Sequence, residues 1–406
     1  MFNENWVALA GFAVLLGLLV RENGLLTMSA LLLSVAGAGW VWNWYSLRSV
    51  AYQRRFSERR AFLGEVVDLT VQVTNRKWLP VAWLRVDDEY PLPVTLMDGD
   101  LQPSTKPDVG LLGNLLSLRW LECVRLRYHL RCTQRGFYAF GPAHLQSGDI
   151  FGLFSSQSDQ PNVDWLIVYP EVRPIEGLSL PPKEPFGEAR ARQRIFEDPS
   201  RAVGVREHRA EDAFKHVHWK ATARRQRLQT KVYEPTTSFQ LVIFLNMATL
   251  PKHWQGTIPE LLERAISVCA SIASDAAQRR VQVGLIANGC WPESDQALKV
   301  LPGRSPDQLM HILEALAAVA VQPTISIEQL LSRESPRLPW AATLLVVTAL
   351  VTEELLAAIV RLQRAGRRLV LVRLDKAPMP FAVDRLTVQR VEDLGTAFRL
   401  VTEDAG

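Results

Sequence analysis

The sequence predicts a chain in three parts. We expect two N-terminal transmembrane helices, then an antiparallel β-sandwich-like domain, then an α/β domain with a Rossmann-type parallel sheet. Two uncharged apolar runs stand near the N-terminus, a period-two pattern starts after Gly64, and apolar strands alternate with helical segments after Phe239. Alternation of continuous apolar strands with helices is typical of a doubly wound parallel sheet.

Length and composition set limits on the function. The 406 residues are enough for two or three domains, and the formal net charge of +4 is mild for this size. Nucleic-acid binding usually needs a strongly basic domain, so we expect no nucleic-acid partner. The four cysteines form no CxxC pair, which disfavours a zinc site and fits reduced thiols.

The N-terminal runs predict a membrane hairpin over residues 1–47. Residues 6–20 read WVALAGFAVLLGLLV, and residues 25–44 read LLTMSALLLSVAGAGWVWNW. The second run has about the length that a membrane-spanning helix needs. A cleaved signal peptide is the competing interpretation, but the start MFNEN lacks a basic residue.

A basic cluster then predicts the orientation. It follows the second run and consists of Arg48, Arg54, Arg55, Arg59 and Arg60. The positive-inside rule places both termini and the later domains in the cytoplasm, in an integral protein of the cell (inner) membrane. The cluster is either a topology signal alone or also a contact with anionic lipid of the bilayer, and the sequence leaves both open.

The middle of the chain predicts strands and then a linker. Val67, Leu69, Val71 and Val73 alternate with polar residues, as in a strand with one buried face. Similar short strands separated by turns indicate a β-sandwich-like domain over residues 48–175. Prolines and alternating charges between residues 176 and 200 indicate an extended linker.

Residues 201–406 are predicted to hold the α/β domain. Its expected strands are apolar runs at 239–245, 281–287, 342–350 and 368–374. In such sheets ligands bind beyond the carboxyl ends of the strands, where Asn246 and Thr348 stand. We therefore expect these two residues at a protein-binding rim. The absence of GxGxxG and P-loop motifs disfavours a nucleotide site and predicts no cofactor.

The stretch VREHRAEDAFKHVHWKATARRQRLQTKVYE (205–234) raises several alternatives. Its histidines and Asp212 suggest a metal site or acid–base catalysis, but the surroundings are cationic. We favour a structural brace in which Trp219 is a buried anchor and Asp212 pairs with Arg206 or Arg224. A helix or helix–turn covering the sheet, followed by a strand, is expected, with a charged docking face exposed.

This stretch resembles the signature of the domain of unknown function 58 family. The matching residues are Arg206, Asp212, Lys215, His216, Trp219, Ala223, Arg224 and Glu234. The upstream segments FLGEVVDLTVQVTN, LPVAWLRV, RGFYAFGP and SGDIFGLF are also similar to the family. His208 departs from the family's usual Tyr, and Ala210-Glu211 departs from Pro-Gly.

The resemblance implies a von Willebrand factor A-like domain, in which Asp-x-Ser-x-Ser often binds Mg²⁺ after the first strand. Here residues 246–250 read NMATL. Mg²⁺ requires anionic oxygen ligands in near-octahedral geometry. Neutral Asn246 with Ala248 and Leu250 cannot supply them well, so we expect a degenerate site without functional metal.

The resemblance also implies a partner, a MoxR-type AAA ATPase that would bind the ATP. We therefore expect a non-enzymatic, membrane-anchored cytoplasmic scaffold or assembly factor that also meets an unidentified client protein. The brace Arg206, Asp212, Trp219, Arg224 and Glu234 would lie near the contact. The alternative is a membrane-bound hydrolase that uses Asp212 and a nearby histidine.

Overall fold

The computed structural model divides the chain into two compact units. The first contains Met1–Glu171 and Leu313–Val319, and the second contains Val172–Ile312 and Ala320–Gly406. The structure describes residues 11–12, 15, 23–178, 202–209, 214, 217–233, 240–251, 256–291, 297–320, 325–340, 342–383 and 386–403.

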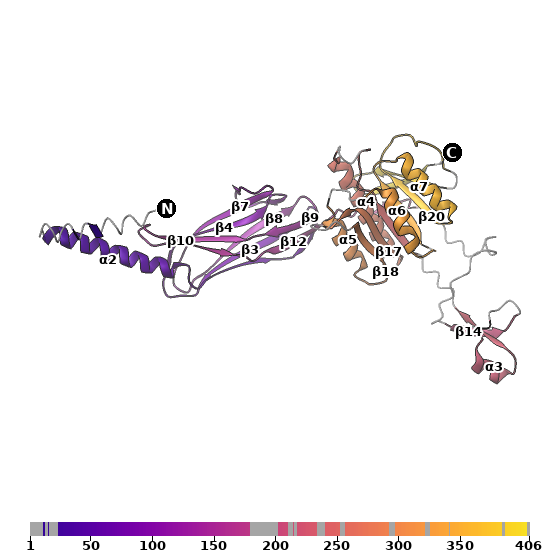
Figure 1. Ribbon diagram of the computed structural model, residues 1–406, viewed down its shortest axis with the longest axis horizontal. Helices are drawn as coiled ribbons and strands as arrows, with labels where there is room; N and C mark the ends of the chain where they lie inside the picture. The colour runs from indigo at the N-terminus through magenta and orange to yellow at the C-terminus, as the bar shows by residue number, and fades with distance from the viewer. Residues whose placement is uncertain are drawn as a thin grey trace. The chain divides into compact units, whose positions relative to one another are not determined.

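The first unit is built from three β-sheets, whose strands run from purple to magenta in Figure 1. The first sheet has the order β1 (Val50–Phe56), β3 (Val66–Asn75), β8 (Cys123–Cys132), β5 (Val94–Leu96). The second has the order β11 (Ser155–Gln160), β10 (Ala143–Gly148), β4 (Val81–Pro91), β7 (Val109–Leu118), β6 (Gln102–Pro103). The third has the order β2 (Arg60–Phe62), β12 (Asp164–Tyr169), β9 (Gly136–Phe140).

Alternation along the strands creates the core of this unit. In β3, Val67, Leu69, Val71 and Val73 are buried, while the residues between them are at most partly buried. Because side chains of a strand alternate between its two faces, one face of β3 joins the apolar core. The same core includes Leu84 and other buried residues from β4. Three sheets surround it rather than the two of the predicted sandwich.

Helix α2 (Asn23–Ser46) precedes these strands. No helix in the described part of the chain is long and apolar enough to cross a membrane. The prediction of two transmembrane helices is therefore wrong, and with it the assignment to the inner membrane as an integral protein with cytoplasmic domains. The first run, 6–20, lies outside the described residues except for positions 11, 12 and 15.

The second unit contains an eight-stranded sheet. Its order is β13 (Ile175–Glu176), β22 (Phe398–Glu403), β21 (Thr387–Asp393), β20 (Arg368–Arg373), β19 (Thr343–Thr348), β16 (Gln240–Leu245), β17 (Gln282–Cys290), β18 (Ala297–Gly303). The central strands pair in parallel, for example β16 with both β17 and β19. Their side chains are buried on both faces, as expected where helices cover a sheet.

The helices of this unit are α4 (Pro259–Gln278), α6 (Ile327–Glu334) and α7 (Glu353–Arg364), with the 3-10 turn η4 (Ser335–Arg337) after α6 (Figure 1). Helix α5 (Gln308–Ala318) begins in this unit, and its residues from Leu313 onward are assigned to the first unit. Helices α6 and α7 share one apolar cluster with Phe244 and Leu344 of the sheet. Both helices begin with a side-chain cap, in which Ser326 accepts from Gln329 N and Thr352 from Leu355 N. Hydroxyl caps satisfy N–H groups that the first turn leaves open.

The predicted Rossmann-type parallel sheet is wrong, because this sheet is mixed. Strand β17 pairs antiparallel with β18, and β21 pairs antiparallel with β22. Only residues 291–296 and 394–397 join these pairs. A parallel pair needs a crossover of a dozen or more residues, so such short connections impose antiparallel pairing.

Gly141 shows how closely backbone and side chains approach in the first unit. Its φ is +101°, and a Cβ there would lie 2.7 Å from the Asn162 carbonyl oxygen and against the Arg54 guanidinium. We expect Gly141→Ala to lower the free energy of unfolding of this unit by about 2–4 kcal/mol, from backbone strain and overlap together.

Gly152 offers the matched control. Its φ is also positive, at +71°, but a Cβ there meets nothing within 4 Å. Gly152→Ala should therefore lower the free energy by only about 1 kcal/mol, from the backbone alone. Urea unfolding of the full chain measures both variants. Equal losses would show that the overlap at Gly141 is unimportant.

Candidate functional site

The carboxyl edge of the parallel strands brings three polar residues together. Asn246 follows β16, Asn288 lies near the end of β17, and Thr348 ends β19. In the pairing register, Leu245 stands opposite both Ala287 and Val347. Each next residue along these parallel strands therefore meets the others. We call Asn246, Asn288 and Thr348 the amide network.

Hydrogen bonds connect all three side chains. The Asn246 amide Nδ2 donates to Thr348 Oγ1 at 3.0 Å. Asn288 Nδ2 donates to Asn246 Oδ1 at 3.1 Å. The exposed fractions are 5%, 1% and 0% for Asn246, Asn288 and Thr348. Such buried polar groups are stable only when they are paired.

The same side chains fix the loops that leave the strands. Asn288 Oδ1 accepts from Met247 N at 2.7 Å, and Asn246 Oδ1 accepts from Ala248 N at 3.1 Å. Thr348 Oγ1 donates to the Leu350 carbonyl at 2.6 Å. Asn246 and Thr348 are thus buried groups that position loop backbone. They do not stand exposed on the predicted protein-binding rim.

The chemistry of this edge does not suit Mg²⁺. The side-chain oxygens at this edge belong to neutral amide and hydroxyl groups, and these oxygens already take part in hydrogen bonds. Mg²⁺ favours anionic oxygen with water around it. Among the residues that the structure describes, no group of three or more His, Cys, Asp or Glu could hold a metal ion.

The second candidate is the signature hairpin, which we define as residues 202–233. Strands β14 (Ala202–Glu207) and β15 (Gln229–Tyr233) pair antiparallel, and helix α3 (Trp219–Arg225) lies between them in sequence (Figure 1). These two strands form a sheet of their own, separate from the hydrogen-bonded order of the eight-stranded sheet.

Two histidines of the hairpin have structural partners. His218 caps α3, because its Nδ1 accepts from Ala221 N at 3.1 Å. The His208 ring lies 2.9 Å from the Thr230 hydroxyl, measured from Nδ1 to Oγ1. Thr230 is 3% exposed. These contacts order the helix N-terminus and join His208 to strand β15 through the Nδ1 atom of each ring.

The predicted brace is only partly observable. Asp212 and Glu234 lie outside the described residues. Arg206 donates from a guanidinium NH group to the Glu207 carbonyl at 3.1 Å, and Arg224 is exposed on α3. The expected burial of Trp219 is wrong, since its exposed fraction is 65%. It begins a helix of which no described residue is buried, so no core surrounds the indole.

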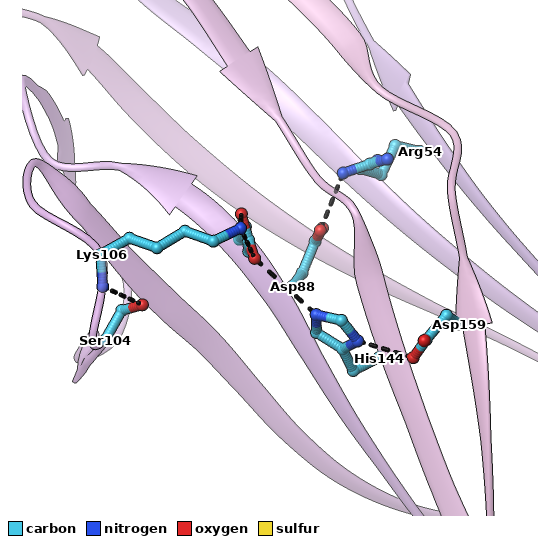
Figure 2. A network of polar contacts seen from close by, with 7 residues as sticks. Arg54, Asp88, Ser104, Lys106, His144 and Asp159 are labelled. Atoms are coloured by element: carbon cyan, nitrogen blue, oxygen red, sulfur yellow. Dashed lines mark hydrogen bonds and ion pairs between the residues drawn. The ribbon is translucent and has the colours of Figure 1, made fainter.

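A third polar cluster, in the first unit, was missed by the sequence analysis. Figure 2 shows Arg54 directed at Asp88, with an Nη1–Oδ1 distance of 2.8 Å. Tyr52 donates to the other oxygen of the Asp88 carboxylate at 2.5 Å. The Arg54 side chain also lies 3.3 Å from Asp164 and donates to the Asn162 carbonyl. Arg54 is therefore a buried structural ion, which excludes it from the predicted lipid contact.

Neighbouring charges extend this cluster. Lys106 Nζ lies 2.6 Å from Glu89 Oε1, and His144 Nδ1 lies 2.7 Å from Asp159 Oδ1 (Figure 2). The hydrogen bond that His144 donates to the Asp159 carboxylate raises the pKa of His144. Burial raises the pKa of Asp88 to about 6, although the Arg54 charge acts in the opposite direction.

A sequence signal for this cluster did exist. Tyr52 and Arg54 are separated by one residue in β1, and both are buried, whereas Gln53 and Arg55 are exposed. Period-two alternation places Tyr52 and Arg54 on the same face of the strand. Grouping Arg54 with the other arginines of the basic cluster concealed that alternation.

Asp88 should make the stability of the chain depend on pH. Because its folded pKa is about 6, the folded state binds more protons than the unfolded state between about pH 4 and pH 6. The free energy of unfolding therefore falls as pH rises through this window, by about 3 kcal/mol from this group. Asp88→Asn should remove this pH-dependent part of the free energy of unfolding.

The measurement is urea unfolding of wild type and variant at several pH values between 4 and 7. The wild-type advantage over Asp88→Asn should be largest at low pH and shrink as pH rises. Asp87→Asn is the control, because Asp87 pairs with Arg85 on a more open face at 2.8 Å. Parallel curves for wild type and Asp88→Asn would contradict the assignment. The charges of Arg54, Asp164 and Glu89 surround position 88 and are the same in wild type and variant.

The amide network gives a second prediction. Asn246→Asp removes the donor to Thr348 and buries a negative charge, which should lower the free energy of unfolding by about 2–4 kcal/mol. Millimolar Mg²⁺ should not restore stability, because the remaining ligands are neutral. Thermal unfolding with and without MgCl₂ measures both effects.

Gln329→Glu makes the same amide-to-carboxylate change at an exposed position in α6. It should leave the melting temperature nearly unchanged. A rise in the melting temperature of Asn246→Asp on adding Mg²⁺ would show that the loop can still hold a metal.

Comparisons with known proteins find one family model and one curated relative. Residues 204–386 match the family described as "Protein of unknown function DUF58". The "Uncharacterized protein YeaD" of Bacillus subtilis (strain 168) is 24% identical over 316 residues, which cover 77% of this chain and 73% of that protein.

Solved structures are similar only locally. A cohesin module from a family 33 glycoside hydrolase of Clostridium perfringens ATCC13124 aligns with 30% of this chain and 96% of its own, at 13% identity and a TM-score of 0.21. A β-glucosidase from Listeria innocua aligns with 29% of this chain and 16% of its own, at 11% identity and a TM-score of 0.19. These scores carry no argument about fold or function. The match over the signature hairpin and the parallel strands confirms the expected resemblance, since residues 204–386 match the model of the DUF58 family of proteins of unknown function.

Proposed function

We propose that this chain is a protein-docking module rather than an enzyme, and that the signature hairpin carries its contact face. The partner would be a MoxR-type AAA ATPase that acts on an unidentified client protein. The ATP would be bound by that partner. The choice of partner rests on the family resemblance, whereas the choice of surface rests on the side chains of the hairpin.

Exposed aromatic residues are the observation that carries the proposal. Trp219 and Phe214 have exposed fractions of 65% and 66%. Large aromatic side chains in water are unfavourable unless a partner covers them, because burial of apolar area is the main driving force of association. Tryptophan is also enriched among the residues that dominate binding energy at protein interfaces.

The described part of the hairpin is rich in basic residues. They are Arg206, Arg209, Lys220, Arg224, Arg225, Arg227 and Lys231, and Glu207 is the one acidic residue among the described positions. Glu207 lies 3.3 Å from Arg227 in an exposed ion pair. The face is therefore complementary to an acidic surface, and complementary charge speeds encounter and selects partners.

The hairpin is also held rigidly enough to act as a docking element. The His218 cap and the Thr222 hydroxyl, which accepts from Gln229 N at 3.0 Å, join helix to strand. An ordered contact face loses less side-chain and loop freedom when it binds. The hydrolase alternative depends on Asp212, which lies outside the described residues.

Trp219→Ala should weaken binding of the purified full chain to its purified AAA ATPase by about tenfold or more, as expected for a central aromatic contact. Arg224→Glu should weaken binding further at low salt, because it places like charges together. The dissociation constant is measured by calorimetry, with and without ATP.

Trp78→Ala is the matched control, since Trp78 is an even more exposed tryptophan at 78% and belongs to the first unit. It should leave the affinity unchanged. Absence of binding with either nucleotide state would reject the ATPase as partner. An equal loss for Trp78→Ala and Trp219→Ala would reject the hairpin as the contact face.

A further inference from the structure

A cavity of about 360 Å³ lies in the first unit between α2 and β11. Its walls include Trp40, Asn43, Trp44 and Arg48 from the helical end and Ser156 and Ser158 from the strand. The hydroxyls of Ser46 and Ser156 lie 3.0 Å apart and join the two elements. The cavity is thus formed by segments more than a hundred residues apart in the chain.

The cavity has a cation without an internal counter-ion. The Arg48 guanidinium stacks over the Trp44 ring at 3.5 Å from its centroid. No carboxylate among the described residues forms an ion pair with Arg48. Stacking holds a guanidinium in place while its N–H groups remain able to donate. Arg48 is therefore prepared to receive an anion.

The partial negative charge at the C-terminus of α2 does not neutralise Arg48, because Lys77 already binds the carbonyls there. The Lys77 ammonium donates to the carbonyls of Ser46 and Arg48, at 2.9 Å for Arg48. Burial lowers the pKa of Lys77 to about 8, so the group is still largely protonated at neutral pH. A cation at a helix C-terminus offsets the partial charge of the last carbonyls.

A buried acceptor in the wall has no partner. Asn43 Oδ1 is inaccessible to water and makes no hydrogen bond among the described atoms. Buried polar atoms without partners are rare in native proteins. Because this oxygen has no exposed surface, a ligand reaches it only when the Asn43 amide rotates toward the cavity, and a ligand hydroxyl then supplies the missing donor. This observation is independent of the charge on Arg48.

Trp40 and Trp44 make the remaining wall apolar. Their exposed fractions are 58% and 49%, so both indoles present ring surface that an apolar group can cover. The cavity therefore combines one cation, an acceptor that needs a donor, serine hydroxyls and an aromatic wall.

We infer that this cavity binds an amphiphilic organic phosphate that carries a hydroxyl group. The phosphate accepts paired N–H bonds from Arg48, which suits the planar guanidinium fork. The ligand hydroxyl donates to Asn43 Oδ1, and the apolar part covers Trp40 and Trp44. A soluble phosphate ester and a phospholipid headgroup share this chemistry.

The test uses the full chain and three probes in calorimetric titrations. They are glycerol 3-phosphate, dihexanoylphosphatidylglycerol below its critical micelle concentration, and dihexanoylphosphatidylcholine as a zwitterionic control without the hydroxyl. Binding of glycerol 3-phosphate as tight as that of the lipid would overturn the amphiphilic part of the inference and leave a soluble ester as the source. Binding of phosphatidylglycerol alone would identify a lipid. Equal binding of the choline lipid would overturn the assignment.

Arg48→Gln should weaken binding of the best probe by about tenfold or more, because a charge-assisted bidentate contact is lost. Arg55→Gln removes the same charge from an exposed position on β1 and should leave binding within about twofold, since single exposed charges contribute little. Asn43→Leu should weaken the hydroxyl-bearing probe but not the choline lipid. Thermal unfolding checks that each variant is folded. No binding by wild type, or unchanged binding in folded Arg48→Gln, would refute the inference.

Discussion

The constraint on which both units depend is that a buried polar group must find its partner inside the protein. In the second unit this produces the amide network, in which Asn246 and Asn288 bond to each other and to the backbone of two loops. In the first unit it produces the Arg54–Asp88 pair. Breaking either leaves an unpaired group in a dry environment, which costs more than the intact contact contributes. Both clusters are therefore fixed parts of the architecture.

This constraint also separates structural sites from candidate functional surfaces. The amide network is saturated, so it orders the carboxyl edge of the sheet without offering atoms to a ligand. The signature hairpin shows the opposite balance, with polar groups satisfied locally and the rings of Trp219 and Phe214 left in water. Polar groups that are already paired inside the chain contribute to its stability. Side chains that remain exposed, such as these two rings, are the ones that a partner can cover.

The sequence patterns predicted where strands occur better than they predicted how those strands pair in a sheet. The apolar runs at 239–245 and 368–374 are strands β16 and β20, because continuous apolar runs of this length are buried on both faces. The mixed order of the sheet depends on connection lengths, which periodicity does not report. The membrane prediction rested on two apolar runs, but no helix in the described part of the chain is long and apolar enough to cross a membrane. The exposure of Trp219 could not be predicted, since an indole suits a core and an interface equally.

Two arginines of the basic cluster show why a run of charges has no single meaning. Arg54 shares a strand face with Tyr52, and its desolvation is offset by Asp88, so any ligand would have to compete with an internal carboxylate. Arg48 stands just beyond the last residue of α2, where stacking on Trp44 orders it without neutralising it. Binding of an anion there breaks no ion pair with any described carboxylate and releases only water. The difference between a structural ion and a binding site therefore depends on whether the fold already provides the opposite charge.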